Sequence, residues 1–103
     1  MRCYSLLLGA RNARRTFSAK DDAQVRAVTL RHFPTGFTIL SSLGAGYDPT
    51  RRRFRLEQSR QILVATSSAA KVRRYAEALA AALHQHELMV VELGKAYFVT
   101  RGS

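Results

Sequence analysis

The densest group of side chains able to bind a ligand is Arg51-Arg52-Arg53, followed by Arg55 and preceded by Tyr47. A guanidinium group is planar and permanently charged, so neighbouring arginines can hold several phosphate oxygens at once. Alternation along a strand puts Arg53 and Arg55 on one face and turns Arg52 away. We therefore expect Arg51, Arg53 and Arg55 to bind an anion, with Tyr47 stacking on a base or ribose. The alternative is a solvated loop whose charges protect an edge strand.

A second basic cluster follows the first apolar segment of the chain. Arg11, Arg14 and Arg15 lie there, with Asn12 among them. In the topology deduced below this cluster occupies a loop at one end of the sheet. We expect Arg11 and Arg14 to contribute further contacts to the anion.

The overall charge agrees with an anionic partner. Seventeen Lys and Arg against seven Asp and Glu give a net charge of +10, and 14 of the basic residues are arginine. Most of the excess lies in residues 1–56, which carry +8 against +2 in residues 57–103. Such a charge favours anionic partners and salt-sensitive binding to phosphates.

Residues for catalysis or metal binding are few. Cys3 is the one cysteine, and His84 and His86 lack further ligands at metal-binding spacing. The chain contains no phosphate-binding glycine loop and no nucleophile motif. We therefore expect no catalytic residues, no metal, no cofactor and no enzymatic activity.

Apolar periodicity and turn residues predict the order β-α-β-β-α-β. For a chain of this size the order predicts one α+β domain over residues 1–103, a ferredoxin-like sandwich. In that fold a four-stranded antiparallel sheet carries both helices on one face. Ser18 caps the first helix, with Asp21 and Asp22 near its positive end. The expected elements are strands at 4–9, 36–43, 54–66 and 88–99, and helices at 19–32 and after Ser67 or Ser68.

The two faces of the expected sheet differ in their cover. Five apolar residues of the second helix share one stripe and should pack against the sheet. The other face of the sheet is not covered by a helix. Apolar residues stand at successive positions of its strands, so both faces are apolar, and we expect the uncovered face to be buried against another surface. We therefore expect a homo-oligomer. The stripe consists of Val72, Tyr75, Ala76, Leu79 and Leu83.

Short motifs stand in order along most of the chain, from roughly Tyr4 to Val99. The set resembles a group of small bacterial and phage proteins that includes domains of unknown function and the phage Thoeris anti-defence proteins. The resemblance implies a sponge for cyclised ADP-ribose immune signals, with Asn12, Tyr47 and the nearby arginines in its pocket. Nitrogen-regulatory PII-like trimers share the element order, and the arginine-rich hairpin lies at the position of their regulatory loop. The motifs are Gly9-Ala10-Arg11-Asn12, Gly36-Phe37-Thr38, Gly46-Tyr47, Glu57-Gln58-Ser59, and Gln85 to Val91.

These observations lead to competing functions. The first is a non-enzymatic homo-oligomer that sequesters a small anionic nucleotide signal and so counteracts host immune signalling. The alternative is a basic protein that binds nucleic acid or inhibits a nuclease complex, which rests on the net charge. A ferredoxin-like enzyme of the dimeric-barrel type ranks third. The apolar runs are shorter than the ~18 residues of a membrane span, so we expect a cytoplasmic protein without a membrane partner.

Overall fold

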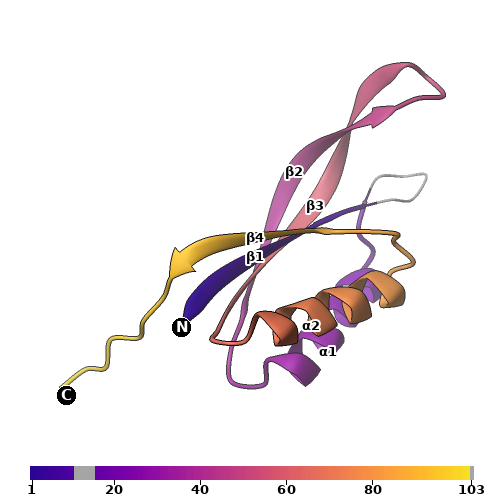
Figure 1. Cartoon of the computed structure of the whole chain (residues 1–103). Coiled ribbons are helices and arrows are strands. Elements are labelled where there is room, and N and C mark those ends of the chain that lie inside the picture. The colour runs from indigo at the N-terminus through magenta and orange to yellow at the C-terminus, as the bar shows by residue number, and fades with distance from the viewer. Residues whose placement is uncertain (11–15, 103) are drawn as a thin grey trace.

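The computed structural model describes residues 1–10 and 16–102. In this part of the chain four strands form one antiparallel sheet in the order β2-β3-β1-β4, and both helices lie on the same face (Figure 1). The predicted α+β ferredoxin-like fold is confirmed. No helix of the described residues is long and apolar enough to span a bilayer. The elements are β1 (Arg2–Gly9), α1 (Ala19–His32), β2 (Thr38–Asp48), β3 (Arg53–Thr66), α2 (Ala69–Ala82) and β4 (Met89–Lys95).

Serine side chains start both helices, as the sequence predicts. Ser18 Oγ accepts a hydrogen bond from the Asp21 N–H at 3.1 Å, and the Asp21 carboxylate accepts one from the Ser18 N–H at 2.9 Å. This reciprocal pair satisfies two backbone donors at the start of α1. At the start of α2, Ser68 Oγ accepts a single hydrogen bond from the Lys71 N–H at 3.1 Å.

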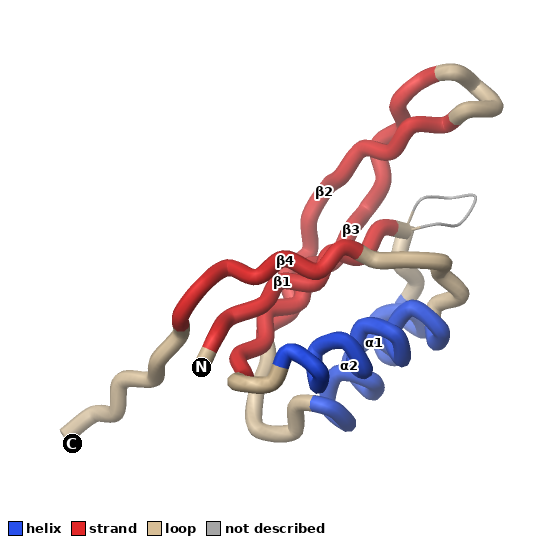
Figure 2. Tube along the Cα trace, in the orientation of Figure 1, coloured by secondary structure: helices blue, strands red, loops and turns tan. Residues whose placement is uncertain are grey.

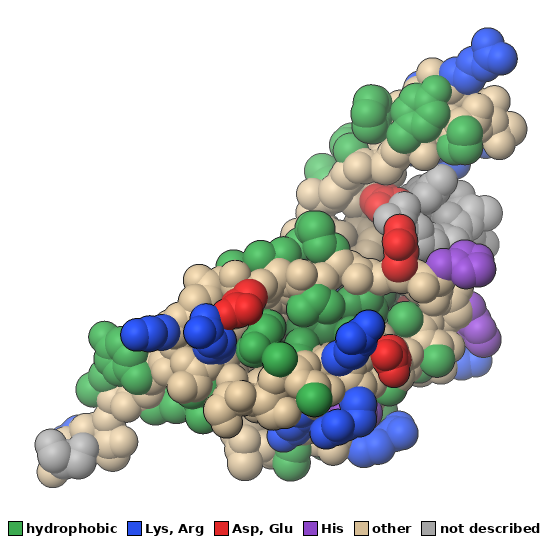
Figure 3. All heavy atoms as spheres, in the orientation of Figure 1, with side chains coloured by type: hydrophobic (Ala, Val, Ile, Leu, Met, Phe, Trp, Pro, Cys, Tyr) green, Lys and Arg blue, Asp and Glu red, His purple; other side chains and the backbone are tan. Residues whose placement is uncertain are grey.

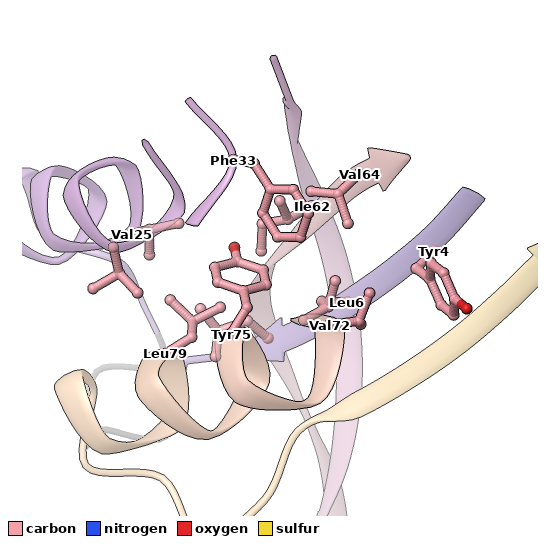
Figure 4. Close-up of a cluster of buried hydrophobic side chains, with 11 residues drawn as sticks. Tyr4, Leu6, Val25, Phe33, Ile62, Val64, Val72, Tyr75 and Leu79 are labelled. Carbon is pink, nitrogen blue, oxygen red and sulfur yellow. The ribbon is translucent and has the colours of Figure 1, made fainter. Parts of the chain in front are cut away.

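The core lies between the helices and one face of the sheet (Figure 4). From α2, Val72, Tyr75 and Leu79 are buried, while Ala76 and Leu83 are partly buried, which confirms the predicted inner stripe. The Phe33 ring, at the end of α1, meets the Tyr75 ring edge to face, with centroids 5.2 Å apart. The remaining buried apolar side chains of this cluster are Tyr4, Leu6, Leu8, Val25, Val28, Ile62 and Val64.

One hydroxyl pair crosses this apolar core. Thr29 Oγ1 lies 2.6 Å from the Val25 carbonyl oxygen and 2.6 Å from the Tyr75 hydroxyl. A carbonyl oxygen can only accept, so Thr29 donates to Val25 and Tyr75 donates to Thr29. Burial raises the pKa of Tyr75 above its ordinary value. The pair joins α1 to α2 with its polar atoms satisfied.

The sheet face away from the helices is less apolar than the sequence predicts. The Gln61 side chain donates a hydrogen bond to the buried Ser5 hydroxyl at 2.9 Å. Ser42 and Ser59, which are directly opposite each other on β2 and β3, join their hydroxyls at 2.6 Å. Apolar residues such as Leu7 lie beside these pairs, so the face is mixed rather than uniformly hydrophobic.

The β2–β3 hairpin is longer than predicted and projects beyond the helices (Figures 1 and 2). We call its distal part, residues 43–56, the arm. The strand predicted from the sequence ends at Leu43, but β2 runs through Gly44 and Gly46 to Asp48, paired residue by residue with β3. Continuous pairing with β3 outweighs the weak strand preference of glycine. The molecule is therefore elongated, at 56 × 25 × 24 Å.

Candidate ligand-binding site

Asp48 organises the tip of the arm. Its Oδ1 accepts hydrogen bonds from the backbone N–H groups of Thr50 at 3.0 Å and Arg51 at 3.2 Å. The Arg51 N–H bond lowers the pKa of Asp48, the Thr50 N–H and nearby guanidinium groups add to this effect, and desolvation opposes it. Asp48 is therefore ionised at neutral pH. It closes a turn in which Arg52 adopts a positive φ of 51°.

Four arginines follow this single carboxylate within seven residues of the chain, and two of them approach it. Arg51 Nε lies 3.9 Å and Arg55 Nη1 3.6 Å from Asp48 Oδ2. Arg52 and Arg53 are exposed, and neither forms an ion pair with any described residue. The register places Arg53 opposite Asp48 and Arg55 opposite Gly46, on one face of the arm. The tip thus carries more arginines than acidic groups, and basic side chains are visible at the end of the arm in Figure 3. Two of these arginines, Arg51 and Arg55, lie close to the Asp48 carboxylate.

Tyr47 lies on the opposite face of the arm from these two arginines. It is directly across from Phe54, and the two rings meet edge to face with centroids 5.5 Å apart. Strand alternation therefore separates Tyr47 from Arg53 and Arg55 within one chain. A single ligand on one copy contacts either the arginine face or the aromatic face.

A groove lined by both polar and apolar side chains lies at the base of the arm, on the helix-free face of the sheet. Its volume is about 640 Å³, within the range of small-molecule sites. Arg55, two residues before Glu57 in β3, lies on the same face of the strand. The rise of a strand places it roughly 7 Å closer to the tip. Arg55 thus stands next to one end of the groove, and Arg53 lies about 13 Å from Glu57 by the same rise. The polar side chains that line it are Ser42, Glu57, Ser59, Gln61, Gln85 and Glu87.

Several of these side chains are held in place. Gln85 Nε2 donates to the Gly9 carbonyl oxygen at 2.6 Å, and the Ser42–Ser59 and Gln61–Ser5 bonds fix three more. Glu57 is buried, with only 6% of its surface exposed. The groove is therefore a preformed set of hydrogen-bonding groups rather than a flexible surface.

The predicted contributions of Arg11, Asn12 and Arg14 lie outside the described residues. The described ends of that connection meet at one residue of β3. The Ala10 N–H donates to the Gln58 backbone oxygen, and the Phe17 N–H donates to the Gln58 side chain, each at 2.9 Å.

The groove residues are the part of the site that the sequence analysis did not find. Glu57 and Gln85 enter the sequence analysis only as parts of short motifs. Glu57, Ser59 and Gln61 stand at alternate positions of a strand, and that polar alternation is the signal that could have revealed the groove. Among the described residues, no three His, Cys, Asp or Glu lie close enough to hold a metal ion.

Solved structures with a similar fold have low sequence identity to this chain. A phage SAM lyase in complex with S-methyl-5'-thioadenosine superposes with a TM-score of 0.62 at 16% identity, covering 85% of this chain and 76% of the lyase. The periplasmic divalent cation tolerance protein CutA from Archaeoglobus fulgidus gives 0.63 at 8%, covering 94% and 87%. The B. subtilis GlnK–ATP complex gives 0.52 at 13%, covering 89% and 83%. No protein-family model matches the sequence, and no curated protein matches it.

The lyase corrects one expectation from the sequence. We expected no enzymatic activity because the chain lacks a recognised catalytic motif. An enzyme is nevertheless built on this same fold. The absence of a motif is therefore no ground for calling the protein non-enzymatic, and that prediction is wrong.

Proposed function

We propose that the protein is a homo-oligomer that binds a small phosphorylated nucleotide. The phosphate groups contact Arg53 and Arg55, and the nucleoside occupies the groove at the base of the arm. The observation that carries this proposal is the position of Arg55, at the inner end of the arginine-rich tip, next to a groove whose polar side chains are held in place. The resemblance in the sequence adds a role, namely sequestration of a cyclised ADP-ribose type of immune signal.

The groove offers hydrogen-bonding side chains for a neutral part of a ligand, and the arginines beyond it offer positive charge for an anionic part. The serine and glutamine side chains of the groove can donate hydrogen bonds to ribose and base oxygen or nitrogen atoms and accept them from hydroxyl and amino groups. Arginine forks bind the phosphate oxygens at the other end. A ligand with a neutral, hydroxyl-rich part and an anionic part fits this order. Two similar folds, GlnK with ATP and the phage lyase with S-methyl-5'-thioadenosine, were solved with adenosine-containing ligands, which supports a ligand with a nucleoside part.

Self-association is proposed from the aromatic face of the arm. Leu43, Tyr47, Phe54 and Leu56 are 68%, 56%, 72% and 68% exposed, and register places Tyr47 beside Phe54. A contiguous apolar surface of this kind is uncommon on a monomer. A second copy covers it and can bring its own groups to the nucleotide. Tyr47 of one copy would then reach a ligand held by the arginines of another.

Isothermal titration calorimetry tests the nucleotide site. The probes are ADP-ribose, cyclic ADP-ribose, cyclic AMP, ATP and a short DNA duplex. We expect saturable binding of at least one nucleotide, weakened about a hundredfold or more in Arg53→Ala/Arg55→Ala, because each charge-assisted contact contributes ~1.5–3 kcal/mol. The matched control removes two exposed helix arginines, Arg26→Ala/Arg74→Ala, and should bind as the wild type does.

Other outcomes separate the alternatives. Binding of DNA alone, weakening steeply as salt rises, would replace this proposal with a nucleic-acid function. Binding of no probe would leave the arginine-rich tip as a solvated turn. Chromatography of the recovered nucleotide shows whether it leaves the protein intact, as sequestration requires, or converted.

A further inference from the structure

The outer edge of β4 is unpaired among the described residues, and apolar side chains lie on both of its faces. Met89, Val90 and Leu93 are 58%, 41% and 55% exposed. Strand β4 pairs with β1 on one side only, since it ends the sheet order. An edge with free backbone groups and exposed apolar side chains is a template for another strand.

A groove runs along this edge between β4 and α2. Its volume is about 530 Å³. Val72, Ala76 and Val90 contribute to its apolar floor, and glutamates 77, 87 and 92 stand around it. Hydrophobic side chains are visible in this region of Figure 3, with charged side chains beside them. The groove is open to solvent in a single copy.

The C-terminal segment is apolar, exposed and close to this edge in the chain. Tyr97, Phe98 and Val99 are 84%, 76% and 85% exposed. The Ala96 N–H donates to the Met1 carbonyl oxygen at 3.0 Å, so the segment starts beside β1 and leads away from the body (Figure 1). This direction carries it away from its own groove.

We infer that the C-terminal segment of one copy lies antiparallel along β4 of a second copy, and that the second copy returns the same contact. This exchange specifies one surface of the proposed homo-oligomer, and it rests on the self-association part of the proposed function. It does not require nucleotide binding. A reciprocal contact of this kind is isologous and closes as a dimer.

The lengths match. The groove follows α2 from Ala69 to Ala80, which is roughly 17 Å at the helical rise. Residues 96–101 in extended form span about the same distance. Alternation sends Phe98 to one face of the sheet and Tyr97 and Val99 to the other. The added strand therefore covers apolar side chains on both faces of β4 and pairs its free backbone groups.

The charges favour the antiparallel direction. Lys95 and Arg101 flank the apolar segment, so an antiparallel strand brings Arg101 to the start of β4, beside Glu87. Glu87 forms no ion pair with any described residue, whereas Glu92 contacts Arg2 and Glu77 lies 3.7 Å from Arg73. Exposed pairs add little affinity, but they select orientation.

Sedimentation equilibrium of the full chain tests this inference. Phe98→Asp/Val99→Asp should lower the mass of the assembly twofold. The control Leu30→Asp makes the same kind of apolar-to-acid change at an exposed position of α1, and it should not change the mass. The calorimetric affinity for nucleotide should stay the same, because these residues are remote from the arm. An unchanged mass in the tail variant overturns the inference.

Two further measurements keep its failure distinct from that of the proposed function. If Phe54→Asp/Leu56→Asp lowers the mass while the tail variant does not, self-association stands and the tail contact is wrong. Hydrogen exchange of residues 89–95 should slow as protein concentration rises, and the tail variant should abolish that dependence. Protection of β4 that does not vary with concentration would place the segment on its own chain and overturn the exchange.

Discussion

The hydroxyl pair between the helices makes an asymmetric prediction about stability. Tyr75→Phe removes a hydroxyl that donates to Thr29, yet Thr29 keeps its own acceptor, the Val25 carbonyl oxygen. We expect a loss of about 1 kcal/mol in the free energy of unfolding, the usual net value of one hydrogen bond.

Thr29→Val should cost more, although it also removes one side-chain hydroxyl. Tyr75 is fully buried, so its hydroxyl would lose its acceptor in the core. Leaving a buried donor unsatisfied costs about 1–3 kcal/mol. The double variant Thr29→Val/Tyr75→Phe removes both groups and should cost less than the sum of the single changes.

Urea denaturation at matched protein concentration measures all four proteins. These four proteins form a double-mutant cycle, which should give a coupling free energy of at least about 0.5 kcal/mol between positions 29 and 75. If Tyr75→Phe costs more than Thr29→Val, the donor assignment is wrong. If the two changes simply add, the hydroxyls do not interact as the structure describes.

Three further predictions concern the alkaline stability of the protein, the Asp22–Arg60 ion pair and the buried Leu79. Burial raises the pKa of Tyr75 above its ordinary value of about 10. The stability that comes from the neutral Tyr75 hydroxyl is therefore complete below about pH 10 and is lost as pH rises through the folded-state pKa. Urea denaturation between pH 8 and 11 should show this loss in the free energy of unfolding of the wild type, and less of it in Tyr75→Phe. Asp22→Asn should lower the free energy of unfolding by about 1.5–3 kcal/mol, because Arg60 Nε and Nη2 donate to the two Asp22 oxygens at 2.9 and 3.2 Å. Arg60→Lys should lower it by a similar amount, because a lysine cannot make the two-point contact. Wild-type stability in Arg60→Lys would rule that contact out. Leu79→Ala should cost ~2–5 kcal/mol by thermal or urea unfolding, as its side chain is fully buried; a loss under about 0.5 kcal/mol would contradict that burial.

Local patterns were sufficient to predict the helices. Ser18 and Asp21 form the cap that their spacing predicts, and the stripe through Tyr75 and Leu79 faces the core. Both features depend on residues three or four apart in one helix, so no distant contact is needed to predict them.

The arm could not be predicted in the same way, because its geometry depends on pairing between strands. Gly44 and Gly46 weaken the local strand pattern after Leu43, yet β3 pairs with them along a continuous strand. The separation of Tyr47 from Arg53 follows from register, and a shift of one residue would reverse it. The burial of Glu57 likewise depends on which strands flank it. The candidate arginines were thus predicted from composition, while the groove beside them required the sheet.

Native mass spectrometry with added nucleotide tests the central claim most directly, since it reports assembly mass and bound ligand together. The wild type, with ADP-ribose, cyclic ADP-ribose, cyclic AMP or ATP, should give a multiple of 11.5 kDa that carries at least one of these nucleotides. Arg53→Ala/Arg55→Ala should keep the same multiple and lose the nucleotide. A bare 11.5 kDa monomer, or a double variant that retains the nucleotide as the wild type does, would contradict the proposed function.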